Sequence, residues 1–97
     1  MRYKTWISIN KENFRNNLGI FRKLLSDETK LCAVVKSNAY GHGLIDFSLL
    51  ADAEGVDGFC VDSVVEGFAL REAGVEKPIL VLGPTLPELL PLLIRLE

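Results

Sequence analysis

This sequence of 97 residues has no excess of basic charge and no long apolar run, and it contains only two cysteines and one histidine. The net charge is −2, so the basic excess that nucleic acids or anionic membrane surfaces require is missing. The longest apolar runs, such as residues 79–82, are far shorter than the ~20 residues that span a bilayer. No apolar run of signal-peptide length follows Met1. We therefore expect a cytoplasmic protein without a nucleic-acid or membrane partner.

The two cysteines and the single histidine do not form a recognisable metal-ligand pattern. Cys32 and Cys60 lie in apolar runs and have no further cysteine or histidine at ligand spacing, so no metal site is expected. We interpret both as buried, reduced thiols rather than as a disulfide. The sequence also lacks the G-x-x-x-x-G-K-[ST] pattern of a Walker A phosphate loop.

Helix and strand patterns alternate along most of the chain, which predicts an α/β fold. Asn10 is a plausible N-cap, and one apolar helical stripe follows it: Phe14, Leu18, Phe21 and Leu25. Three apolar runs, at residues 31–35, 59–61 and 79–82, predict strands, and the first is typical of a parallel strand covered on both faces. Between them we expect helices over residues 44–54 and from a capping box at Ser63 and Glu66 to Gly74. This order predicts parallel strands joined by right-handed crossovers.

The two ends of the chain follow other patterns. Residues 6–10 alternate apolar with polar side chains, which predicts a half-exposed strand of a different sheet. Thr85 and Glu88 have capping-box spacing at the start of a last helix, which Pro91 should kink or shorten. Three βα units would leave two open sheet edges, so we expect the chain to be the front part of a larger protein.

The candidate catalytic and ligand-binding residues follow the first predicted strand. Lys36 stands at its carboxyl end, on the rim where α/β folds bind ligands, and a desolvated amine there can form a Schiff base. On position alone, a lysine that extends into water is the more common explanation. Gly41 and Gly43 permit turns close to a ligand, and the next helix should present free N–H groups to an anion such as phosphate. We interpret His42 as bonded to the backbone rather than as a catalytic base.

This stretch, residues 33–43, reads AVVKSNAYGHG and closely resembles the pyridoxal-phosphate attachment signature of bacterial alanine racemases. Residues 6–10 are similar to the opening strand of that family. Residues 70–74 and 78–83 are similar to the next characteristic segment of that family's sequence. The resemblance therefore covers nearly all of the chain.

The resemblance implies a cofactor site and a reaction. Lys36 would hold pyridoxal phosphate covalently and then act as general acid or base on one face of the substrate α-carbon. Tyr40 would contact the cofactor phosphate, and Leu82 would line the cofactor ring. The implied function is that of an isomerase which interconverts L-alanine and D-alanine, a small amino-acid substrate, and so supplies D-alanine for peptidoglycan.

The resemblance also implies an architecture. The family fold is a TIM-type (β/α)8 barrel followed by a β-rich domain, with active sites at the interface of a homodimer. Residues 1–10 would then be a strand that pairs with the β domain, and residues 11–97 the first three βα units of the barrel. The family's opposite-face tyrosine base and pyridine-facing arginine have no counterpart here, so we expect the isolated chain to be inactive.

Three other interpretations stay open on the sequence alone. The chain could belong to a related racemase that acts on serine or another amino acid. It could be a non-catalytic protein that carries pyridoxal phosphate on Lys36, although such carriers resemble the family only weakly around their lysine. It could also be a structural fragment that binds no cofactor.

Overall fold

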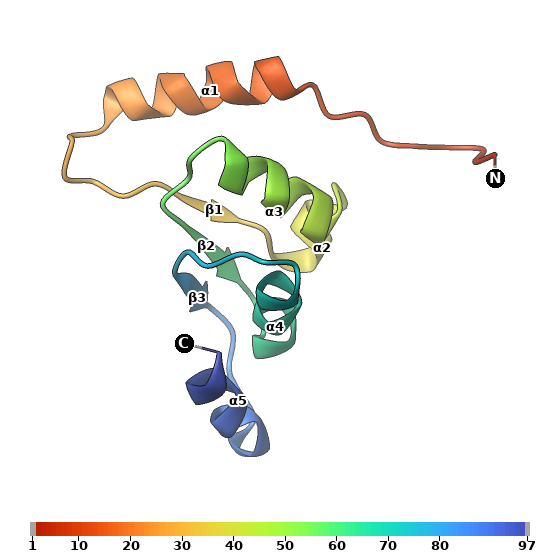
Figure 1. Ribbon diagram of the computed structural model, residues 1–97, viewed down its shortest axis with the longest axis vertical. Helices are drawn as coiled ribbons and strands as arrows, with labels where there is room; N and C mark the ends of the chain where they lie inside the picture. Colours follow the sequence, from red (N-terminus) through yellow and green to blue (C-terminus); the bar gives the residue numbers. More distant parts are fainter. Residues whose placement is uncertain (1, 97) are drawn as a thin grey trace.

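The computed structural model describes residues 2–96 and contains a three-stranded parallel sheet in the order β1-β2-β3 (Figure 1). The elements in chain order are α1 (Lys11–Leu24), β1 (Cys32–Val34), α2 (Lys36–Tyr40), α3 (Leu44–Ala53), β2 (Gly58–Val61), α4 (Val64–Glu72), β3 (Ile79–Val81), the 3-10 turn η1 (Pro87–Leu89) and α5 (Leu90–Arg95). The predicted α/β fold with parallel strands is confirmed. The two segments predicted from the sequence, residues 1–10 and 11–97, begin and end at Met1 and Glu97, and these two residues lie outside the described part of the chain.

The two faces of the sheet differ in how well they are covered. Phe59 and Val61 of β2 are buried in the core together with Ala51 of α3 and Leu70 of α4. On the opposite face Val34 of β1 and Leu80 of β3 are exposed, Leu80 to 59%, and Cys60 of β2 is half-buried. Successive side chains of a strand point to opposite faces, so helices packed on one side bury only every second residue. The core is therefore a single layer between the sheet and the helices.

This one-sided arrangement corrects two expectations about β1. The run at residues 31–35 was expected to be covered on both faces, but Cys32 and Val34 are exposed and Ala33 is half-buried. The expectation of two buried cysteines is likewise wrong for Cys32, and Cys60 is only half-buried. An apolar run indicates that a strand can be covered, but only the neighbouring elements determine which faces are. Both thiols are free, as expected.

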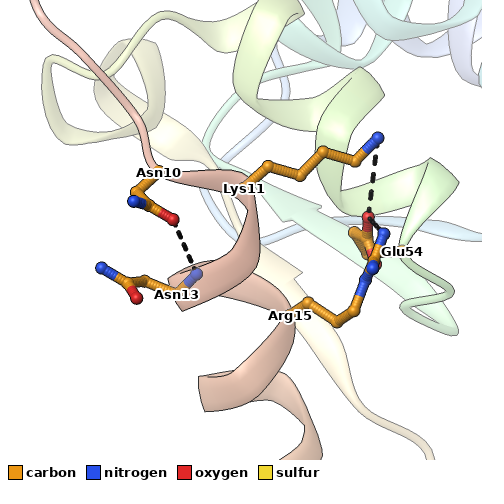
Figure 2. A network of polar contacts seen from close by, with 5 residues as sticks. All are labelled: Asn10, Lys11, Asn13, Arg15 and Glu54. Carbon is orange, nitrogen blue, oxygen red and sulfur yellow. Dashed lines mark hydrogen bonds and ion pairs between the residues drawn. The ribbon is translucent and has the colours of Figure 1, made fainter.

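Helix α1 begins where the sequence predicts and is attached to α3. The side chain of Asn10 accepts a hydrogen bond from the Asn13 N–H at 2.9 Å, which confirms the N-cap (Figure 2). Arg15 makes two hydrogen bonds to the Glu54 carboxylate, and Lys11 lies 3.9 Å from the same group. These contacts fix the start of α1 against the end of α3. Of the predicted stripe, Phe14, Leu18 and Leu25 are half-buried, whereas Phe21 is exposed.

Residues 2–10 precede α1 as an extended segment that runs away from the sheet (Figure 1). The strand expected at residues 6–10 is not formed in the structure, and Trp6 is exposed. A strand requires a neighbour that exchanges backbone hydrogen bonds with it, and no other part of residues 2–96 pairs with this segment. Its pairing with a β domain remains a prediction.

Of the two capping boxes that the sequence predicts, one forms and the other does not. The capping box at Ser63 and Glu66 is present at the start of α4 and is confirmed. The one expected at Thr85 and Glu88 does not form, because the turn is capped by Leu86 and begins with Pro87. Proline fits the first helical turn, where an N–H has no intrahelical partner. Helix α5 is short, as expected, but the reason differs: Pro91 lies in its first turn and does not interrupt a helix that begins at Thr85. No helix within residues 2–96 has the length and apolar character needed to cross a membrane.

Candidate functional site

The carboxyl ends of the three strands form one edge of the sheet, and the candidate residues lie along it. The last row of paired residues that crosses all three strands consists of Val34, Cys60 and Leu80. Lys36, Asp62 and Leu82 each follow this row by two residues. The backbone pairing continues beyond the strands, since the Leu82 N–H donates to the Val61 carbonyl at 2.8 Å. The structure therefore places Lys36 and Leu82 at the same edge, with Asp62 between them.

The exposure of the three sequence-derived site residues varies. Lys36 is half-buried, whereas Tyr40 and Leu82 are 60% and 51% exposed. None of them lines the hollow of about 80 Å³ between α4, β3 and α5. Within residues 2–96 no three histidine, cysteine or acidic side chains gather as metal ligands do.

Lys36 is followed by a left-handed turn, where the sequence suggested only a loop. Ser37, Asn38, Ala39 and Tyr40 all have φ between 53° and 56°. This conformation costs L-amino acids roughly 1–2 kcal/mol per residue. Four consecutive non-glycine residues in this region are therefore strained, and such strain concentrates at functional sites.

Asn38 and Ala39 provide much of the hydrogen bonding around this turn. The Ala39 N–H donates to the Val35 carbonyl at 2.8 Å, and the Ala39 side chain is buried in the core. The Asn38 carbonyl accepts the N–H groups of Gly41 and Gly43, and its side-chain oxygen accepts the Leu44 N–H at 2.8 Å. The expectation that the start of α3 offers free N–H groups is therefore wrong for Leu44. Sequence reasoning assigned no role to Asn38, because an asparagine inside a motif does not reveal its partner.

The remaining motif residues behave as the sequence suggested. Nδ1 of His42 lies 2.9 Å from the Ala39 carbonyl oxygen, which confirms its interpretation as a backbone-bonded loop histidine. Gly41 and Gly43 have φ of 92° and 97°, a region that glycine enters without strain.

Glu66 of α4 contacts this edge from the second βα unit. Its Oε1 accepts the N–H groups of Asp62 at 2.8 Å and Ser63 at 3.1 Å. Its Oε2 accepts the Ser37 N–H at 3.0 Å. The capping-box pattern predicted the bond from Ser63, but it carried no signal for the bond from Ser37, 29 residues away.

Gly83 lies beside Asp62, just beyond the ends of β2 and β3. Its N–H donates to the Asp62 carbonyl at 2.9 Å. A Cβ on Gly83 would collide with that carbonyl oxygen and would lie 2.9 Å from Oδ1 of the Asp62 side chain. Glycine at this position allows the two strand ends to remain in contact beside Leu82.

The comparisons with known proteins agree with this geometry. The model of the family described as "Alanine racemase, N-terminal domain" matches residues 9–97. An alanine racemase from Streptococcus uberis is 43% identical over 91 residues, which are 94% of this chain and 24% of the relative. The crystal structure of alanine racemase from E. faecalis superposes with a TM-score of 0.84 at 40% identity, over 91% of this chain and 24% of that one.

A histidine racemase from Leuconostoc mesenteroides subsp. sake is also similar, with a TM-score of 0.77 at 30% identity. That match covers 84% of this chain and 22% of the other. The chain thus spans about a quarter of the length of the proteins it matches. The parallel sheet, the motif around Lys36 and these matches lead to one conclusion. This chain belongs to the alanine racemase family and matches the N-terminal domain of that family.

Proposed function

We propose that this chain is the cofactor-bearing amino-terminal part of an alanine racemase. The whole enzyme interconverts L-alanine and D-alanine in the cytoplasm and supplies D-alanine for peptidoglycan. The observation that carries the proposal is the position of Lys36, which lies two residues after the end of a parallel strand and immediately before a strained left-handed turn inside the AVVKSNAYGHG motif. The family relationship supports the reaction class.

The side chains at this edge fit pyridoxal phosphate by their chemistry. Lys36 offers an amine for the aldehyde of the cofactor, and the exposed Tyr40 offers a hydroxyl for its phosphate. Leu82 offers an apolar surface for its ring, because its exposed side chain follows β3 on the uncovered face. When bound, the cofactor supplies a conjugated ring that stabilises negative charge on the substrate α-carbon.

Lys36 has two tasks in this proposal. Its Nζ would hold the cofactor, and the same amine would remove or return the α-proton on one face of the substrate. The turn that follows Lys36 supports both tasks, since a strained but well-bonded backbone holds the lysine at a defined position. Tyr40 orients the cofactor and takes no part in proton transfer.

The remainder of the site comes from other parts of the enzyme in this proposal. These parts are five further barrel strands, a β-rich domain that pairs with residues 1–10, and a second subunit. They supply the opposite-face base and the arginine that faces the pyridine nitrogen. We therefore expect the 97-residue chain by itself not to racemise alanine. Turnover by the purified chain that disappears in the Lys36→Ala variant would contradict this expectation.

Borohydride reduction tests the cofactor assignment directly. The chain is incubated with pyridoxal phosphate, reduced and digested, and each lysine-containing peptide is examined by mass spectrometry for a pyridoxyl adduct. We expect the adduct at Lys36 well above the level at Lys23 and Lys77, and its loss in Lys36→Ala. Tyr40→Phe should retain the adduct but require a cofactor concentration several-fold higher, since one hydrogen bond is lost. An unmodified Lys36 would contradict the cofactor assignment.

A second candidate function is racemisation of another amino acid. The likeness to a protein named as a histidine racemase favours it, because the two share this part of the fold at 30% identity. Exchange of the substrate α-proton in D2O, followed by NMR with alanine, serine and histidine on the whole enzyme, separates the candidates. A non-catalytic carrier of pyridoxal phosphate would form the Lys36 adduct but exchange none of the three.

A further inference from the structure

One carboxylate connects the first two βα units at the candidate site. Glu66 receives three backbone N–H groups, two from the end of β2 through Oε1 and one from Ser37 through Oε2. Hydrogen bonds to an ionised carboxylate are stronger than those between neutral groups. Glu66 therefore does more than cap its own helix, since it also holds the residue that follows Lys36.

The Ser37 N–H needs this partner because the sheet does not provide one. In a parallel ladder, every second N–H of a strand points to the same neighbour. The Val35 N–H donates to the Cys60 carbonyl at 2.9 Å, so the Ser37 N–H is the next donor toward β2. The Asp62 carbonyl accepts from Gly83 instead, and Oε2 of Glu66 takes the Ser37 N–H.

This hydrogen bond also restrains Lys36. The peptide group between Lys36 and Ser37 is planar and includes the Lys36 Cα. Holding the Ser37 N–H in place therefore also fixes the orientation of this peptide plane at Lys36. Ser37 is also the first of the four residues with positive φ. The Glu66 carboxylate thus acts where the extended strand changes into the left-handed turn.

We propose that Glu66 is a positioning residue for Lys36, and that its carboxylate sets the direction in which the lysine side chain leaves the sheet. The proposal rests on the proposed function insofar as Lys36 is the cofactor lysine. Glu66 acts through the Lys36–Ser37 backbone and is assigned no contact with substrate or cofactor.

Two variants separate this role from ordinary helix capping. In Glu66→Gln, the amide oxygen can still accept from Asp62 and Ser63, whereas the amide NH2 faces the Ser37 N–H and cannot accept from it. In Ser63→Ala, the capping bond to the Glu66 N–H is lost, but the carboxylate keeps its bond to Ser37. Both variants disturb the start of α4, and only the first removes the connection to the lysine.

Three measurements on the full 97-residue chain and both variants test the proposal. The first is amide hydrogen exchange at single-residue resolution. We expect Ser37 to exchange at least about tenfold faster in Glu66→Gln, since a charge-assisted hydrogen bond is lost, and within about twofold of the parent in Ser63→Ala. The second is the rate at which acetic anhydride acylates Lys36 relative to Lys23, which should change severalfold in Glu66→Gln alone. The third is the pyridoxyl adduct at Lys36 after reduction, which should fall in Glu66→Gln alone.

The outcomes distinguish this proposal from the proposed function. Unchanged Ser37 exchange in Glu66→Gln overturns the positioning role, as does faster exchange with unchanged acylation and adduct formation at Lys36. Equal effects in both variants also overturn it, because they reveal only a loss of helix stability. A parent chain without an adduct contradicts the proposed function, whereas the exchange and acylation measurements still decide the role of Glu66.

Discussion

Arg22 donates a hydrogen bond from Nη1 to Oδ2 of Asp57 at 2.6 Å, although 35 residues separate the two in sequence. The same Oδ2 accepts the Leu31 N–H at 2.7 Å, and Nη2 of Arg22 donates to the Gly55 carbonyl at 2.8 Å. These bonds tie the end of α1 to the segment before β2 and to the entry of β1. They hold the first strand in the position from which Lys36 extends.

The Arg22–Asp57 pair predicts a specific response to acid. The hydrogen bond from Arg22, together with that from Leu31, lowers the pKa of Asp57 from its ordinary value of 3.8 to about 2. Because the folded pKa lies below the unfolded one, the stabilising contribution is complete above pH 3.8 and is lost as the pH falls toward 2. Arg22→Gln should raise the Asp57 pKa toward 3.8, as measured by NMR of the carboxyl carbon.

Arg15→Gln is the matched control for this titration, since Arg15 pairs with Glu54 and not with Asp57. It should leave the pKa of Asp57 unchanged and raise that of Glu54, whose pKa is lowered chiefly by the hydrogen bond from Arg15. An Asp57 midpoint near 2 in Arg22→Gln would show that the guanidinium is not the cause.

The two faces of the sheet should respond differently to truncation. Phe59 is 1% exposed on the covered face, and Phe59→Ala should lower the free energy of unfolding by about 3–5 kcal/mol. Leu80 is 59% exposed on the other face, and Leu80→Ala should change it by less than about 1 kcal/mol. Urea denaturation of both variants measures the difference. Equal losses would mean that the second face is covered in solution.

Two glycine substitutions should have opposite effects on stability. Gly83→Ala forces a Cβ against the Asp62 backbone and should destabilise the protein by about 1–3 kcal/mol. Gly19→Ala places a Cβ on α1 with no other group within 4 Å and should stabilise it by about 0.5–1 kcal/mol, because alanine favours a helix. The urea midpoints of the two variants should therefore shift in opposite directions. A tolerated Gly83→Ala would show that the strand ends separate easily.

The two thiols should differ in their rate of alkylation. Cys32 is exposed, whereas burial raises the pKa of the half-buried Cys60. Because the thiolate is the reactive form, iodoacetamide at pH 8 should modify Cys32 faster, and mass spectrometry of the two peptides follows both rates. Equal rates would contradict this prediction, because they would mean that Cys60 is as accessible to the reagent as Cys32.

Local patterns predicted most of the secondary structure because their causes lie within a few residues. The Asn10 cap and the Ser63–Glu66 box depend on side chains that reach their own backbone three residues away. The same reasoning failed at Thr85, where the following proline sets the geometry instead. It failed also at residues 6–10, because a strand depends on a partner outside its own segment.

The sequence by itself determined the α/β order, the parallel strands and the family, and it placed Lys36 at a strand end, because periodicity, caps and a long motif are local properties. Only the tertiary structure decided which sheet face is covered, that a strained left-handed turn follows Lys36, and that Glu66 holds the Ser37 N–H. These features depend on contacts between residues far apart in the chain. Such contacts override the conformational preference of each residue, and their geometry exists only once the sheet has assembled.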